Sequence, residues 1–250
     1  MQSRNFASSK SQPTGCVGSP GTQRCLDDEY AAAARRGDVA ATLVALESLA
    51  RRGRIEDCHL QSHRLAHAVY REVGDVERAF LVGGPQCRFG YLHGAVEASG
   101  SAAAAGAPAT HGVAIPRCTR FRSPIQQRAC SHGFGHALML RTRDDLRASI
   151  AGCADAAPHG ISTPSCTAGV LMENSLRFAG RPAFPRAAAQ ACVRASLGRA
   201  CLDNVGIVAA LAVDHDAARA DALCRRLPDA ADRAACATGA RDEIAEAHGQ

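Results

Sequence analysis

The 250-residue sequence has no tryptophan, and only 4% of its residues are aromatic. Its hydrophobic residues, 46% of the chain, are therefore supplied largely by alanine, valine and leucine. Alanine and leucine favour helices, whereas sheets draw on β-branched and aromatic residues. The shortage of aromatic side chains thus favours closely packed helices over a sheet.

Several features that identify common functions are also missing. No run of about 18 apolar residues occurs, so no membrane span is expected. The net charge of +5 comes from arginines interspersed with acidic residues, and Lys10 is the single lysine. Without a dense basic block or aromatic platforms for bases, nucleic-acid binding is disfavoured. Neither a GxGxxG nor a Walker A sequence is present, and no GxSxG surrounds Ser131.

The chain contains twelve cysteines but no CxxC pair. This pattern excludes zinc ribbons, thioredoxin-type redox motifs and CxxCH haem attachment. An even number of cysteines without CxxC favours disulfides and therefore an extracytoplasmic location, periplasmic or secreted. The first 21 residues, however, include no apolar stretch typical of a signal peptide. A different start, another export route and a thiol-rich cytosolic metal-binding protein are the alternatives.

Six cysteines open similar segments, and the last four of these segments are 36, 35 and 35 residues apart. The segments are CHLQSHRLAH, CRFGYLHGAV, CSHGFGHALM, CTAGVLMENS, CLDNVGIVAA and CATGARDEIA, beginning at Cys58, Cys87, Cys130, Cys166, Cys201 and Cys236. The third residue after the cysteine is glycine in four of the six, which indicates either close approach of a neighbouring helix or a turn into the helix. The spacing predicts an all-α array, open or closed, of about 35-residue helical hairpins.

A second cysteine precedes each of the last four openers by 9 to 13 residues, near the end of a helix-like stretch. A loop of this length can bring two Cα atoms within the roughly 4.4–6.8 Å that a disulfide requires, and closing it stabilises the fold by about 3 kcal/mol. The predicted disulfides are Cys118–Cys130, Cys153–Cys166, Cys192–Cys201 and Cys224–Cys236, and the remaining cysteines would pair as Cys58–Cys87 and Cys16–Cys25.

The composition divides the chain into two parts. Residues 1–24 are polar and rich in serine, glycine and proline, and they are expected to be disordered. Residues 25–250 are expected to form one α-helical repeat domain, beginning with a helical pair in 27–52, with a flexible low-complexity insertion near 99–111. The cysteine-opened helices are predicted near 60–72, 88–98, 131–141, 167–178, 202–212 and 237–247.

Six of the ten histidines fall in the first three cysteine-opened segments. Successive members of the set His59, His63 and His67 are four residues apart, as are His132 and His136, so each set lies on one helix face. His93 and His136 occupy the same position, six residues after the cysteine. The other four histidines, His111, His159, His215 and His248, are expected at the surface.

Imidazoles from neighbouring helices, together with a carboxylate, suit Zn²⁺ best and could also hold iron or copper. The predicted metal ligands are His63, His93, His132 and His136, and the predicted catalytic residues are Glu97 and Glu173. Either glutamate could act as a general base toward metal-bound water, or could orient a histidine ligand. The sequence HGFGH lacks the glutamate of HExxH, so these histidines could instead be packing residues.

Two classes of function follow from these patterns. The first is an extracytoplasmic, disulfide-rich metalloprotein, including the case of a metal-dependent enzyme acting on a small-molecule substrate. The second is a non-enzymatic helical scaffold that binds another protein in the groove of the array. The sequence identifies neither the substrate nor the partner.

Overall fold

The computed structural model describes residues 13–17, 22–55, 58–104 and 116–248 of the chain. These residues form twelve α-helices and three short 3-10 helices, and they include no strand. The prediction of an all-α protein is confirmed. Among the helices of these segments, none combines the length and the apolar character needed to cross a membrane.

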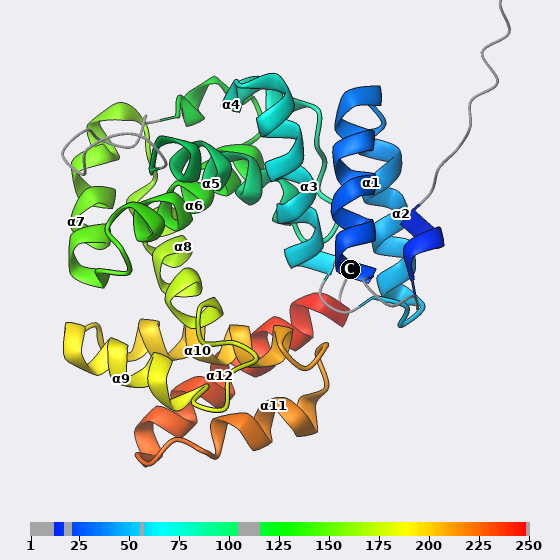
Figure 1. Cartoon of the computed structure of the whole chain (residues 1–250). Coiled ribbons are helices and arrows are strands. Elements are labelled where there is room, and N and C mark those ends of the chain that lie inside the picture. Colours follow the sequence, from blue (N-terminus) through cyan, green and yellow to red (C-terminus); the bar gives the residue numbers. More distant parts are fainter. Residues whose placement is uncertain (1–12, 18–21, 56–57, 105–115, 249–250) are drawn as a thin grey trace, which may run out of the picture.

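Six helices follow one another along a curved path, each packed against the next (Figure 1). They are α3 (Cys58–Val73), α5 (Gly90–Ala104), α6 (Pro124–Arg141), α8 (Thr163–Leu176), α10 (Gly198–Leu211) and α12 (Ala230–His248). Each contains most of the range predicted for it. α6 and α12, however, begin six residues before the cysteine, because Pro124 occupies the first helical position of α6 and the Asp229 carboxylate accepts hydrogen bonds from the first turn of α12.

Shorter helices lie outside this curve (Figure 1). They are α4 (Val76–Leu81), α7 (Leu146–Ala156), α9 (Arg186–Ala195) and α11 (Ala217–Cys224), while α1 (Thr22–Arg36) and α2 (Val39–Arg51) cover α3. Three of the four outer helices begin with an aspartate, Asp75, Asp145 or Asp216, whose carboxylate accepts a backbone N–H of the first turn. Such caps stabilise a helix by about 1 kcal/mol, which matters for helices of 6 to 11 residues.

All twelve cysteines are paired, and the pairs are those that the sequence predicts. The Cα atoms of each pair lie between 5.2 and 5.7 Å apart. Most of these cysteines are buried, so the crosslinks add to a core built largely of small aliphatic side chains. Six disulfides suggest an oxidising, extracytoplasmic environment.

Two of the expected boundaries differ from the structure. Within the segment 1–24, Pro13–Cys16 form a 3-10 helix and α1 begins at Thr22, because the Cys16–Cys25 disulfide joins this segment to α1 and buries Cys16. Within the predicted insertion, α5 continues through Ala104, since alanine is the strongest helix former. Residues 1–12, 18–21 and 105–115, which include His111 and most of both expected segments, lie outside the described residues.

The last helix returns to the first half of the chain (Figure 1). Glu243 of α12 forms an ion pair with Arg88, which precedes α5, and its Oε1 lies 3.1 Å from Nε2 of His215. His215 was expected at the surface, but its side chain is only 19% exposed because it belongs to this contact. His159 is exposed as predicted. The ion pair therefore closes the curved path on itself.

Candidate metal centre

The structure brings the predicted ligand residues together on the first three helices of the curve. His63 lies on α3, His93 on α5, His132 and His136 on α6. The ring centroids of His63 and His93 are 6.0 Å apart, those of His63 and His136 are 5.5 Å apart, and those of His93 and His136 are 6.1 Å apart. Imidazoles from three successive helices thus form one cluster.

Glycines make this convergence geometrically feasible. A Cβ atom on Gly94 of α5 would lie 2.6 Å from Cα of His63, and one on Gly133 of α6 would lie 2.6 Å from the carbonyl oxygen of His93. No side chain fits at either position, so the backbones of neighbouring helices touch where the histidines are. For Gly133, this result decides between the two predicted roles in favour of close helix approach.

His59 belongs to the cluster, although it was not among the predicted ligands. Its ring centroid lies 4.8 Å from that of His63 and 5.3 Å from that of His93. The spacing of four residues from His63 was the sequence signal that could have identified it. His67, one further turn along α3, has its Nε2 atom 3.3 Å from Oε1 of Glu97.

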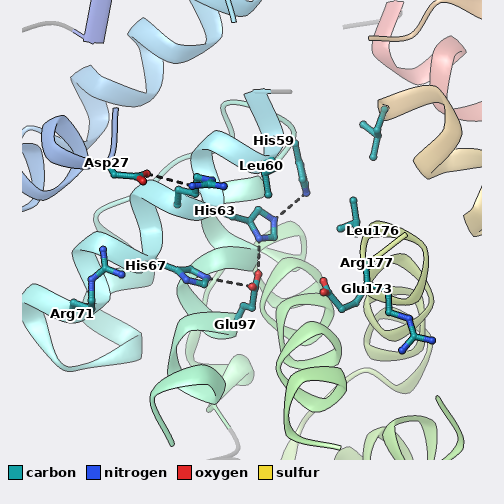
Figure 2. A pocket seen from close by; sticks show the side chains of 12 residues that line it. Asp27, His59, Leu60, His63, His67, Arg71, Glu97, Glu173, Leu176 and Arg177 are labelled. Atoms are coloured by element: carbon teal, nitrogen blue, oxygen red, sulfur yellow. Dashed lines mark hydrogen bonds and ion pairs between the residues drawn. The ribbon is translucent and has the colours of Figure 1, made fainter. Parts of the chain in front are cut away.

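Two glutamates hold two of the imidazoles in fixed orientations. Nδ1 of His63 lies 2.6 Å from Oε2 of Glu97, and Nδ1 of His136 lies 2.8 Å from Oε2 of Glu173 (Figure 2 shows the first contact and the position of Glu173). A carboxylate only accepts, so each Nδ1 donates its proton and each Nε2 is directed away from the carboxylate. Carboxylates orient metal-bound histidines in this way. The predicted role of the two glutamates as bases stays a prediction.

Burial sets the protonation of most of the cluster. It lowers the pKa of His59, His93 and His132 well below the ordinary histidine value, and the positive charge of neighbouring histidines lowers these pKa values further. These three rings are therefore neutral near pH 7. A neutral imidazole retains a nitrogen lone pair that can bind a metal ion.

The contacts between glutamates and histidines shift pKa values in the direction opposite to burial. Burial also disfavours a charged His136, but the hydrogen bond and the negative charge of Glu173 outweigh it and raise the pKa of His136. Burial alone would raise the pKa of Glu97, yet the charge of His63 and hydrogen bonds from the histidines hold that pKa well below its ordinary value. Glu97 is accordingly an anion throughout the neutral range.

Several ring nitrogens of the cluster lack a hydrogen-bond partner. Nδ1 of His93, Nε2 of His132 and Nε2 of His136 are all buried and unpartnered, although part of the His132 ring is exposed. Leaving a buried polar atom unpaired costs about 1–3 kcal/mol. One ligand nitrogen from each of these three residues lies within 4.8 Å of the other two, and the same holds for His59, His63 and His93.

A cleft of about 510 Å³ opens beside His59 and His63 (Figure 2), and a separate cavity of about 310 Å³ is lined by His59, His93 and His132. The lining of the cleft includes His63, His67, Glu97 and Glu173, with the arginines Arg64, Arg71 and Arg177 among the other lining residues. Arg64 forms an ion pair with Asp27, and Arg177 forms one with Asp144. A small molecule could therefore reach both glutamates from solvent.

Other residues considered from the sequence have structural partners. The Tyr91 hydroxyl is buried and donates to the carbonyl of Ala79. The amide nitrogen of Asn174 donates to the carbonyl of Ala188, and the Ser131 hydroxyl accepts from the backbone N–H of Ser162. None of these side chains lines the cleft.

Comparisons of the chain with family models, with curated proteins and with solved structures give no match. Its function must therefore be inferred from the chemistry of its own residues.

Proposed function

We propose that the chain is an extracytoplasmic helical-repeat protein that binds a divalent transition-metal ion through His93, His132 and His136. The observation that carries this proposal is the trio of buried, unpartnered ring nitrogens, one from each of these residues. A metal ion satisfies all three at once, whereas without it each remains unpaired in a low-dielectric interior. The ring centroid of His63 lies 5.5 Å from that of His136 and 6.0 Å from that of His93, close enough to adjust the site.

Zinc is the first candidate because three histidines with one open position are a common catalytic zinc arrangement, and iron and copper accept the same imidazole donors. Glu173 fixes the tautomer of His136 so that Nε2 remains available for the metal. A water molecule in the open position would be acidified by the ion, and Glu97 or Glu173 would act as its general base. The protein would then be a metal-dependent enzyme for a small molecule that enters the cavity of about 310 Å³ lined by His93 and His132.

The proposed location and repeat have separate support. Disulfides persist in the periplasm or outside the cell, and six of them close consecutive short segments of this chain. The last four segments have similar spacing. In four of the six segments the glycine at the third position after the cysteine lies against the backbone of a neighbouring inner helix, at Gly90, Gly133, Gly169 and Gly239. Repeated hairpins of about 35 residues are the arrangement that accounts for both observations.

Elemental analysis tests the metal site. The protein would be produced in an oxidising compartment, stripped with a chelator, incubated with Zn²⁺, Fe²⁺ or Cu²⁺ and desalted. We expect bound metal in the unmodified chain and in His159→Ala, a control in an exposed 3-10 helix, and a large loss in His136→Ala. Circular dichroism would show that both variants remain helical. No bound metal in the unmodified protein would overturn the proposal and favour the scaffold that binds another protein.

A further inference from the structure

All six helices of the curved path line the cavity of about 310 Å³. α3, α5, α6, α8, α10 and α12 each contribute at least one lining residue, and the turn before α5 contributes two more. His93 and His132, two of the proposed metal ligands, are among the lining residues. A molecule in this cavity would therefore lie beside the metal ion.

We propose that this cavity binds a small carboxylate with an apolar body, and that Arg88 holds the carboxylate group. The inference names the substrate class of the proposed metal site and rests on the proposed function. It adds to the metal ligands two features of the cavity wall, an arginine that binds a negative charge and an apolar surface that covers the rest of the molecule.

The apolar surface is the first reason. Four lining side chains are apolar, namely Phe89, Met172, Ile207 and Leu211, and all four are only half-buried. An apolar group that covers them removes this surface from water, which favours binding. The cavity volume of 310 Å³ is near the lower end of the range for ligand pockets and equals that of about ten water molecules. The ligand is therefore small.

The charges in the cavity wall are the second reason. Arg88 and Glu243 are the two lining residues with a formal charge, since burial keeps the lining histidines neutral. They form an ion pair, and Oε1 of Glu243 also lies 3.1 Å from Nε2 of His215. The charge of Glu243 is thus balanced within the protein. A metal dication then adds positive charge to the cavity, which favours an anionic ligand.

The arginine itself is suited to a second carboxylate beside Glu243. The side chain of Arg88 is 23% exposed, compared with 7% for Glu243. It lines the 310 Å³ cavity and also a neighbouring cleft of about 700 Å³. A guanidinium carries five N–H donors in a planar fork and forms paired hydrogen bonds with carboxylates, so one guanidinium can contact two of them.

The backbone fixes Arg88 at the cavity wall. Cys87, Arg88 and Phe89 have φ angles of 52°, 57° and 62°, in the left-handed region that residues other than glycine rarely adopt. A disulfide joins Cys87 to Cys58 at the start of α3, and α5 begins directly after Phe89. Strained backbone of this kind is concentrated at functional sites, where it holds a group in one orientation. Here it brings one charged and one apolar side chain to the same cavity.

Isothermal titration calorimetry of the Zn²⁺-loaded, full-length, disulfide-bonded protein tests the ligand class. The probes are 3-phenylpropanoate, its neutral amide 3-phenylpropanamide, and propanoate, which lacks the ring. We expect 3-phenylpropanoate to bind about 10- to 100-fold more tightly than the amide, which lacks the negative charge. It should exceed propanoate by a similar factor, about 10- to 100-fold, because propanoate leaves the apolar surface uncovered. Equal affinity in either comparison would overturn the inference.

Two variants show whether Arg88 or the metal ion holds the carboxylate. Arg88→Met should lower the affinity for 3-phenylpropanoate to that for the amide, and a preference retained in this variant would overturn the role of Arg88. Glu243→Gln removes the competing carboxylate and keeps Arg88, so it should tighten the binding of 3-phenylpropanoate. Unchanged or weaker binding in Glu243→Gln would also overturn that role. Arg120→Met, at a surface ion pair with Glu77, is the control and should leave all affinities unchanged.

Elemental analysis of the same samples separates this inference from the proposed function. Bound zinc without a preference for 3-phenylpropanoate over its amide would overturn the substrate class and leave the metal site standing. Absence of bound zinc from the unmodified protein would overturn both. Circular dichroism shows which variants are helical, and Glu243→Gln decides the question if Arg88→Met does not fold.

Discussion

The imidazole rings of His63 and His136 lie 5.5 Å apart in an edge-to-face arrangement, although α5 separates the helices that carry them. Helices usually pack at 8–10 Å between axes, so side chains two helices apart do not ordinarily meet. They meet here because the inner helices follow a curve and touch backbone to backbone at glycines. The residues that allow close packing are thus the residues that assemble the cluster.

Glu173 should matter for metal affinity without binding the metal itself. Its carboxylate accepts the Nδ1 proton of His136, which keeps Nε2 of that ring directed at the cluster. We expect Glu173→Ala to weaken Zn²⁺ binding by about 10- to 100-fold, the usual effect of removing such a partner. Competition with a chromophoric chelator measures this. Glu77→Ala, which removes a carboxylate paired with Arg120 at the surface, is the control and should leave affinity unchanged.

Adding a methyl group at a helix contact should affect both the fold and the site. In Gly133→Ala, the new Cβ would lie 2.6 Å from the carbonyl oxygen of His93, so α5 and α6 must separate. We expect a loss of about 1–3 kcal/mol in the free energy of unfolding, together with weaker metal binding. Gly15→Ala is the matched control, because its Cβ would meet nothing within 4 Å. Equal urea midpoints for the two variants would contradict this interpretation.

The sequence was sufficient for local features of the fold. The cysteine pairs follow from short loops between neighbouring segments, and the helices follow from an alanine-rich composition. The predicted first residues of α6 and α12 were too late in the sequence. Pro124 and Asp229 start these helices well before the cysteines on which the prediction was based. The residues that start these helices are local signals in the sequence, but the prediction placed the helix starts by the repeated cysteines instead.

The convergence of the histidines depends on curvature, which the sequence pattern did not determine. A flat stack would place α3 and α8 about 25–30 Å apart. The closure involves a contact between distant segments, the Arg88–Glu243 ion pair, which no short-range pattern indicates. His59 was missed for another reason, since alignment by distance from the cysteine emphasised the position of His93 and His136. The spacing of four residues between His59 and His63 along α3 was the better indication that His59 belongs to the cluster.

The metal-free protein should lose stability as the pH falls below about 6.5. The pKa values of His59, His93 and His132 are lowered on folding, so the unfolded chain binds more protons than the folded chain below that pH. Each such histidine contributes up to about 1.4 kcal/mol per pH unit to this loss until its folded pKa is reached. The lowered pKa of Glu97 adds a further loss below about pH 4.5.

His136 contributes with the opposite sign. Its raised pKa stabilises the fold below pH 6.5, and this stabilisation disappears as the pH rises through the folded pKa. Between pH 6.5 and 5 its contribution is constant, so the three other histidines determine how steeply the free energy of unfolding changes with pH. Urea unfolding at pH 7.0, 6.0 and 5.0 in the presence of a chelator measures this pH dependence. His59→Ala should show a shallower dependence than the unmodified chain, and a flat profile in the unmodified chain would contradict the prediction.

One disulfide should be important for the histidine cluster as well as for stability. Cys58 precedes His59, and the carbonyl of Cys87 accepts the Nδ1 proton of His59. Replacing both cysteines by serine opens a crosslink between residues 29 apart, which costs about 3.5 kcal/mol in the chain-entropy model. It also frees the left-handed turn that holds the carbonyl in place. We therefore expect the double variant to lose stability and also metal affinity, because the His59 ring lies 5.3 Å from that of the proposed ligand His93.

The Cys192–Cys201 disulfide provides the comparison that separates these two effects. It joins α9 to α10 across 9 residues, and neither cysteine lies beside a histidine of the cluster. Its double serine variant should lose about 2.5 kcal/mol of stability but keep its affinity for Zn²⁺. The Cys58 and Cys87 variant should lose about 10- to 100-fold in affinity, because the Cys87 carbonyl no longer fixes His59 beside the proposed ligand His93. Equal Zn²⁺ isotherms for the two variants, measured under conditions where both are folded, would show that the Cys87 carbonyl does not orient His59 for metal binding.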